Sequence, residues 1–383
     1  MEEVLNRDLA YLMLKIISNL INGEATPESI QKLSEEDRND LIRFAKKHSL
    51  SAVTAAGLQH AGFNDPGLLQ IYSQATRRSV LFDHEYGILS RELTNRQIPY
   101  LPIKGILLKS LYPKSWMREM SDIDILTPNA DTQQVKSIME AHGYSVHLFG
   151  RTNHDVYKKP PFFIIEMHND LFNERHYPQF NRYFRGIERL TDDGCHQRMN
   201  LTDCYAYMIA HLYVHYASSG VGLRALLDIC LLRRKYSAEI ADSPLAHALD
   251  ALGLTEFEKE VSRLADKLLE PDSMTQDEKE ALDYYIFSAT FGNRRQFLYN
   301  RIDKYIKSDH TKAGYLRSRF KLSQPAIEAH PFYSKHPRLV PLMWVTRPVK
   351  ALFTKPKAIV KELKILKRYS GDQKSGKNKS GTE

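Results

Sequence analysis

Two aspartates one residue apart form the pattern with the clearest chemical potential in this sequence. Asp122 and Asp124 lie in the short apolar run from Met120 to Leu126, and this is the only Asp-x-Asp in the chain. In a β-strand alternate side chains leave the same face, so both carboxylates would project together. Neighbouring anions repel each other, and a divalent cation with oxygen ligands relieves that repulsion. The alternative is a strand end whose acidic residues face the solvent.

A third carboxylate is predicted in the run 162–168, the most strand-like stretch of the sequence. Ile164, Glu166 and His168 alternate onto one face of an otherwise apolar strand. An unpartnered glutamate there would be costly, so we expect a charge-neutralising partner. A carboxylate cluster that holds about two divalent cations is what metal-assisted nucleotidyl transfer requires. An edge strand on which Glu166 and His168 simply meet water is the alternative.

Candidate phosphate contacts precede the aspartates. Lys104 and Gly105 lie between a predicted strand and a short helix, where a glycine lets backbone amides approach phosphates and a lysine can pair with them. Arg118 is four residues before Asp122 and could reach a triphosphate or the carboxylate cluster. The alternatives are that Gly105 only forms an ordinary turn between a strand and a helix, and that Arg118 is a surface arginine.

The elements that must position these residues alternate between strand and helix from residue 96 to 190. Besides the Asp-x-Asp strand, the patterns predict strands near 97–103, 145–149 and 162–168, and helices near 106–111 and 131–142. Strands that alternate with helices indicate an α/β unit with a mixed sheet.

Helical periodicity is expected on both sides of this unit, in residues 1–95 and 195–369. Ser34 and the acidic residues after it predict a capped helix start, and Asp228 is expected to pair with Arg224 four residues earlier. The Gly-, Ser- and Lys-rich segment 370–383 is expected to be a disordered tail. The predicted fold class is therefore α+β, with a small mixed-sheet core between N-terminal and C-terminal helical regions.

Charge and cysteine content narrow the class of protein. The net charge of +8 favours an anionic partner such as a nucleotide, a nucleic acid or a membrane surface. The basic segment 343–369 could contact RNA, an anionic membrane or a phosphorylated partner, or else be a docked helix with a solvated basic face. Three dispersed cysteines suit a reducing compartment, and no transmembrane segment or signal peptide is expected, so we expect a cytoplasmic protein.

His211 and His215 lie four residues apart, a spacing found in zinc sites. No glutamate follows His211 and no third ligand is indicated, so packing of the two histidines against the α/β unit is the favoured interpretation.

Several short motifs in order resemble the uncharacterised nucleotidyltransferase family within the DNA polymerase beta-like superfamily. The first three are a Lys-Gly turn at 104–105, a Tyr-Pro at 112–113 and an Arg-x-x-Ser-Asp-hydrophobic-Asp strand at 118–124. A Glu-x-His strand at 166–168 and a helical Arg-x-x-x-Asp-Ile element at 224–229 follow. The resemblance covers about residues 35–235. It implies a nucleotidyltransferase fold at 96–190, a Mg²⁺-dependent site with two ions and an NTP donor such as ATP.

Carried over residue by residue, the resemblance implies metal binding and catalysis by Asp122, Asp124 and Glu166. It implies nucleotide contacts by the residues of the turn and of the strand motif, which are Lys104, Gly105, Arg118 and Ser121. The superfamily's Gly-Ser pair is Gly105-Ile106 here, which removes one phosphate contact.

The two hypotheses are an enzyme and a binding module. The enzyme would move a nucleoside monophosphate from an NTP to an unidentified hydroxyl on a small molecule, protein or RNA and release pyrophosphate. The alternative is a catalytically weak or inactive nucleotide-binding regulatory module with the same fold.

Overall fold

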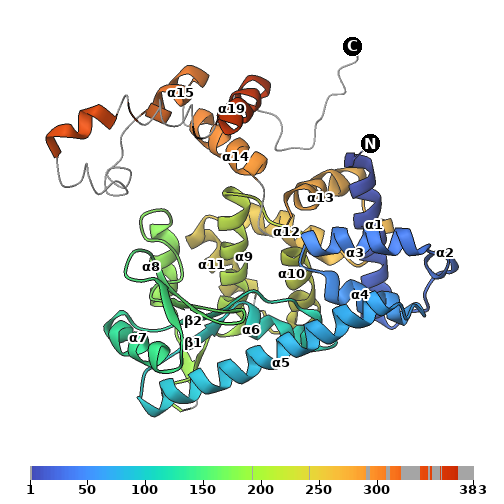
Figure 1. The fold of residues 1–383 in the computed structure, drawn as a ribbon, viewed down its shortest axis with the longest axis horizontal. Helices are drawn as coiled ribbons and strands as arrows, with labels where there is room; N and C mark the ends of the chain where they lie inside the picture. Colours follow the sequence, from blue (N-terminus) through green and yellow to red (C-terminus); the bar gives the residue numbers. More distant parts are fainter. Residues whose placement is uncertain are drawn as a thin grey trace. The chain divides into compact units, whose positions relative to one another are not determined.

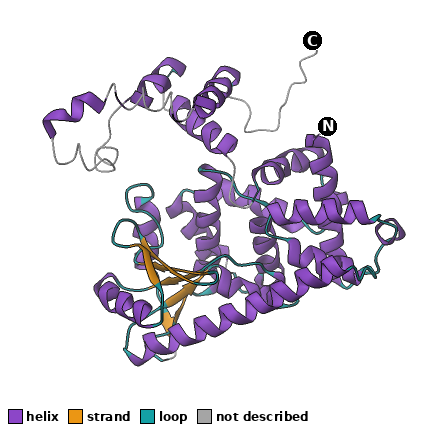
Figure 2. Ribbon diagram, viewed as in Figure 1, coloured by secondary structure: helices purple, strands orange, loops and turns teal. Residues whose placement is uncertain are grey.

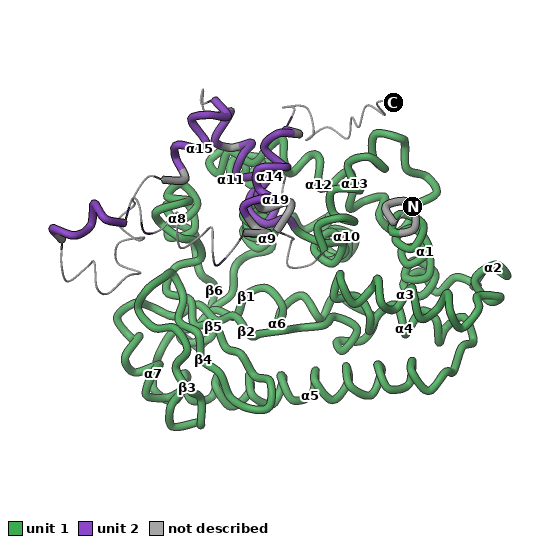
Figure 3. The backbone as a smooth tube through the Cα atoms, turned by 45° about the horizontal axis from the view of Figure 1, so that its top comes forward, with its two compact units in different colours: residues 1–214, 221–290 green, residues 215–220, 291–383 purple. Residues whose placement is uncertain are grey.

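The computed structural model of the chain describes residues 2–191, 193–240, 242–289, 294–307, 311–320, 337–343, 346, 354 and 356–369. The chain divides into two compact units, coloured separately in Figure 3: residues 1–214 with 221–290, and residues 215–220 with 291–383. The division into regions at 1–95, 96–190 and 195–369 stays a prediction. The tail at 370–383 lies outside the described residues.

Helices fill the first part of unit 1, as the sequence predicted. They are α1 (Glu2–Asn22), α2 (Glu28–Gln31), α3 (Glu35–Lys47), α4 (Ser51–His60) and the long α5 (Pro66–Asn95) (Figure 1). Ser34 caps α3: its hydroxyl accepts the backbone N–H of Asp37, whose carboxylate accepts the N–H of Ser34 in return. A cap of this kind stabilises a helix by about 1 kcal/mol. The predicted helix start at Ser34 is confirmed.

A five-stranded mixed sheet follows, drawn in orange in Figure 2. Its strands are β1 (Leu101–Ile103), β2 (Ile123–Leu126), β3 (Ser145–Leu148), β4 (His154–Lys159) and β5 (Phe163–His168), in the spatial order β1-β2-β5-β4-β3. Strands β2 and β5 are parallel, and the other neighbours are antiparallel. The mixed sheet predicted from the sequence is confirmed, whereas β4 was missed.

The alternation of side chains along β2 and β5 separates an apolar face from a polar face. Ile123 and Ile165 belong to a buried core that α5 and α7 (Thr132–Ala141) complete from the same side, with Phe82 and Leu89 of α5 and Val135 of α7 among its members. The next residue along each strand is a carboxylate, which must leave the opposite face. The hydrophobic core thus fixes which way the polar side chains point.

Helices close the rest of unit 1. Their bounds are α8 (Pro178–Gly186), α9 (Leu201–Ala217), α10 (Leu223–Tyr236), α11 (Asp242–Leu252), α12 (Thr255–Lys267) and α13 (Gln276–Ser288), with a small β6–β7 pair at Leu190–Thr191 and Gln197–Arg198. The α+β class with helical flanks is confirmed.

Unit 2 has a core of its own. Helices α14 (Arg294–Lys307), α15 (Lys312–Phe320) and α19 (Pro356–Arg368) contribute Ile302, Tyr315 and Leu366, each almost fully buried. None of the helices that the structure describes is both long enough and apolar enough to cross a bilayer.

Candidate active site

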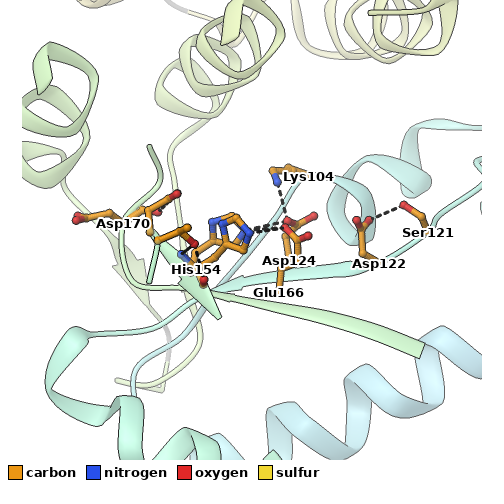
Figure 4. Close-up of polar contacts among 10 residues, drawn as sticks. Lys104, Ser121, Asp122, Asp124, His154, Glu166 and Asp170 are labelled. Atoms are coloured by element: carbon orange, nitrogen blue, oxygen red, sulfur yellow. Dashed lines mark hydrogen bonds and ion pairs between the residues drawn. The ribbon is translucent and has the colours of Figure 1, made fainter. Parts of the chain in front are cut away.

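The parallel pairing of β2 with β5 brings two of the predicted carboxylates side by side. Asp124 lies directly opposite Glu166 in the strand register, although 42 positions separate them in the printed sequence. Asp124 is 4% exposed, whereas the Glu166 side chain is 23% exposed. Figure 4 shows both carboxylates on the same side of the sheet. The site therefore has one buried and one accessible carboxylate.

The third predicted carboxylate, Asp122, immediately precedes β2. Its Oδ1 accepts a hydrogen bond of 3.0 Å from the Ser121 hydroxyl, and its side chain points to the same side as Asp124 (Figure 4). Burial raises the pKa of Asp122, and the negative charges of Asp124 and Glu166 raise it further. The three carboxylates are therefore close enough to repel one another, which is the situation that a bound cation relieves.

The side chains of Lys104 and His168 contact Asp124. The Lys104 ammonium lies 2.6 Å from its Oδ1, and the His168 Nε2 lies 2.9 Å from the same oxygen. Burial alone would raise the pKa of Asp124, but Lys104 and His168 together hold it well below its usual range. Burial and Lys104 oppose protonation of His168, yet its hydrogen bond to Asp124 and the nearby Glu166 carboxylate raise its pKa. Asp124 is thus held as an anion.

The Lys104-Gly105 turn has unusual backbone geometry. Lys104 has φ 54° and ψ −118°, a backbone conformation that residues other than glycine rarely adopt. Helix α6 (Gly105–Leu108) begins directly after it. A Cβ at Gly105 would lie 3.0 Å from an Arg118 guanidinium nitrogen and 3.2 Å from Met120 Cε. The glycine therefore lets the loop before Asp122 pack closely against the turn.

Arg118 is buried rather than on the surface. It is 7% exposed, and its guanidinium donates two hydrogen bonds of 2.8 Å to the carboxylate of Asp228 on α10, which also accepts the Tyr112 hydroxyl at 2.9 Å. The expected pairing of Asp228 with Arg224 is wrong. Arg224 instead donates to the backbone oxygen of Glu119 at 2.9 Å, because Arg118 reaches the carboxylate of Asp228 from the loop.

The loop at 118–121 is held by two further helices. The Glu119 carboxylate accepts hydrogen bonds from the backbone N–H and hydroxyl of Ser51 at the start of α4, at 2.9 and 2.7 Å. Arg78 of α5 donates to the backbone oxygen of Met120 at 2.9 Å. Contacts from α4, α5 and α10 therefore fix the segment that carries Asp122. Sequence reasoning missed Ser51 and Arg78, because nothing local links them to this loop.

His154 was also missed. It lies on β4 directly opposite His168 of β5, and its Nε2 is 4.0 Å from the Glu166 carboxylate. Burial lowers the pKa of His154. Only the position of β4 in the sheet reveals this neighbour, and the sequence pattern did not predict β4.

The donor atoms suit a divalent cation. Carboxylate oxygens of Asp122, Asp124 and Glu166 are ligands that Mg²⁺ and Mn²⁺ accept. Burial first, and then the charges of Asp124 and Glu166, raise the pKa of Asp122, and a bound cation would offset both effects. Among the described residues, three side chains of the ligand types His, Cys, Asp and Glu bring their ligand atoms within 4.8 Å of one another at His154, Glu166 and His168, and this group includes neither His211 nor His215 of α9. The His211 ring lies 6.0 Å from that of Tyr207, one turn earlier on the same helix, and packing of the two histidines against the α/β unit stays a prediction.

Comparison with known proteins places the chain in a family. A family of uncharacterised nucleotidyltransferases matches residues 34–270, which is more than half of the chain and includes the whole sheet, the loop before Asp122 and α10. No curated protein and no solved structure matches the chain. The order of the motifs and the match over this span agree, and the chain belongs to this uncharacterised nucleotidyltransferase family.

Proposed function

We propose that this protein transfers a nucleoside monophosphate from an NTP to a hydroxyl acceptor and releases pyrophosphate, with Mg²⁺ as cofactor. The observation that carries the proposal is the pairing of Asp124 with Glu166 across β2 and β5, with Asp122 at the start of the same strand. Membership of the family supports the reaction class.

The chemistry assigns a role to each carboxylate. Asp122, Asp124 and Glu166 would hold two Mg²⁺ ions, which supply charge neutralisation of the triphosphate and acidify the attacking hydroxyl. The acceptor oxygen forms a bond to the α-phosphorus while the bond from that phosphorus to the pyrophosphate oxygen breaks. Glu166, the more exposed carboxylate, is placed to accept the hydroxyl proton.

The cationic residues position the donor and the loop. Lys104 would contact the phosphates from its place beside Asp124, and Gly105 would let the backbone of the turn approach them. The guanidinium of Arg118 is engaged by Asp228, so we assign Arg118 to holding the loop rather than to direct triphosphate contact. Ser121 would orient the Asp122 carboxylate through its hydrogen bond.

Loss of Mg²⁺-dependent turnover in carboxylate variants tests the mechanism. Asp122→Asn and Asp124→Asn should each reduce pyrophosphate release at least about a hundredfold, because each removes a charge that holds metal. Glu140→Gln, at an exposed site on α7, is the matched control and should keep full turnover. Circular dichroism checks folding. Unchanged turnover in folded Asp122→Asn and Asp124→Asn would overturn the mechanism.

The assay must also identify the donor and the acceptor. ATP is the first donor to test, followed by the other NTPs, each with Mg²⁺. Mass spectrometry of mixed small-molecule, protein and RNA hydroxyl acceptors would detect the added nucleoside monophosphate. The exposed lysines of α19, which are Lys361, Lys364 and Lys367, support a proposed contact of the basic segment with an anionic acceptor such as RNA.

One observation favours the second candidate, a nucleotide-binding module without turnover. The Lys104 ammonium lies 2.6 Å from Asp124 and supplies a positive charge to this carboxylate from the protein itself. Thermal shift measurements with each NTP, with and without Mg²⁺, separate the two candidates. Stabilisation by NTP without any pyrophosphate release supports the module, and release that requires Mg²⁺ supports the enzyme.

A further inference from the structure

Two histidines lie beside Glu166 on the polar face of the sheet. His154 and His168 face each other across the antiparallel β4–β5 pair, with ring centroids 5.0 Å apart. Glu166 is two residues before His168 and so leaves the same face. Its Oε2 lies 3.6 Å from His168 Nε2 and 4.0 Å from His154 Nε2. Figure 4 labels His154 and Glu166. One ligand atom from each of the three residues lies within 4.8 Å of the others.

The proposed transfer reaction leaves these imidazoles without a role of their own. His168 is 4% exposed, and its Nδ1 is buried with no hydrogen-bond partner among the described residues. The Nδ1 of His154 is in the same condition. These unpartnered atoms are Nδ1 atoms, whereas the Nε2 atoms lie near Glu166, so the case for a bound ligand rests on the cluster of ligand atoms from the three residues.

We propose that His154, Glu166 and His168 form a binding site for a first-row transition-metal dication, such as Mn²⁺ or Zn²⁺, next to Asp124. The inference rests on the proposed function in one respect, since Glu166 would serve both this ion and the Mg²⁺ chemistry. Imidazole nitrogen suits transition metals, whereas Mg²⁺ prefers oxygen ligands and keeps water. The site therefore selects the metal at this end of the carboxylate cluster.

The geometry is close to what coordination needs. Metal–nitrogen bonds of about 2.0–2.1 Å place neighbouring ligand atoms about 3–3.5 Å apart. The separations of 3.6 and 4.0 Å around Glu166 Oε2 exceed this value by less than about 1 Å, and the ligand atoms of the two imidazoles lie within 4.8 Å of each other, so the side chains must move together to bind an ion. Coordination through His168 Nε2 would replace its hydrogen bond to Asp124, and Lys104 would remain as a partner of that carboxylate.

Electron spin echo spectroscopy of Mn²⁺ added to the full-length protein, without nucleotide, reads out the coordinating nitrogen directly. The wild type should show ¹⁴N modulation from bound imidazole, and His154→Gln should weaken this modulation and lower Mn²⁺ affinity at least about tenfold. His147→Gln is the matched control, because His147 is an exposed histidine on β3. It should keep both the modulation and the affinity.

Two results would overturn the site: no ¹⁴N modulation in the wild type, or modulation and Mn²⁺ affinity that are unchanged in His154→Gln. His168→Gln is a second test variant, but His168 is more buried than His154 and its replacement could prevent folding. In that case the result for His154→Gln alone decides whether the metal site exists. The measurement needs no turnover, so a protein that releases no pyrophosphate but shows the modulation refutes the proposed function and keeps the metal site. Pyrophosphate release by a protein that shows no ¹⁴N modulation refutes the metal site and keeps the proposed function.

Discussion

Lys104 combines an electrostatic role with a strained backbone. Its ammonium lies 2.6 Å from a carboxylate that is almost fully buried, and it is the cation nearest to where we place the phosphates. A lysine in this place offsets the negative charge of Asp124, which would otherwise repel a triphosphate.

Removal of this charge should weaken nucleotide binding. Lys104→Ala is expected to lower the affinity for NTP in the presence of Mg²⁺ about tenfold or more, because a hydrogen bond to a charged group contributes about 1.5–3 kcal/mol. Equilibrium dialysis with labelled ATP measures the affinity. Lys46→Ala, at an exposed site on α3, should bind as the wild type does. An unchanged affinity in Lys104→Ala would remove Lys104 from the binding site.

At the scale of elements, the loop before β2 depends on contacts that come from distant helices. The buried Arg118–Asp228 pair joins this loop to α10, with side chains 6% and 4% exposed. A buried ion pair adds little stability compared with apolar residues of the same volume, but removal of one partner leaves an uncompensated charge.

Single substitutions in this pair should therefore destabilise unit 1 strongly. Arg118→Ala and Asp228→Ala are each expected to lower the free energy of unfolding by about 3–5 kcal/mol, and the double variant should lose less than their sum. Urea unfolding followed by circular dichroism provides the values. Arg185→Ala, which breaks an exposed pair with Asp170, should cost at most about 1 kcal/mol. Strict additivity in the double variant would show that the two side chains act independently.

At the scale of the whole molecule, acid should destabilise unit 1 through a buried histidine. His48 is 1% exposed, and its Nδ1 accepts the backbone N–H of Leu223 at 3.3 Å. Burial, with a smaller contribution from Lys47, lowers the pKa of His48 from 6.5 to about 4. Between these values the unfolded chain binds a proton that the folded chain does not, so the free energy of unfolding falls as the pH falls.

The loss from this histidine should be on the order of 3 kcal/mol between pH 7 and pH 4. Urea unfolding of a Trp344→Phe protein, in which Trp116 is the remaining tryptophan, follows unit 1 at each pH. His48→Gln in the same background should show a flatter dependence on pH, and the exposed His60→Gln should not. Parallel curves for His48→Gln and its parent would show that His48 has the same pKa in the folded and unfolded states, against this prediction.

Local patterns predicted part of this molecule, and long-range contacts decided the rest. The helix start at Ser34 and the position of Glu166 on the polar face of its strand both follow from spacings of a few residues, so they could be predicted from the sequence. The Arg118–Asp228 pair joins residues 110 positions apart, and no local pattern distinguishes it from a pair within α10. His154 was missed because β4 mixes polar and apolar residues and reaches the site only through its place in the sheet.

The strained backbone of Lys104 also has an evolutionary consequence. Glycine adopts a positive φ at little cost, whereas a lysine there costs on the order of 1–3 kcal/mol. Under selection for thermostability alone, replacement of this lysine by glycine would relieve that strain. A protein that keeps the strained lysine therefore gives up stability at this position, as we expect where the side chain serves the proposed phosphate contact.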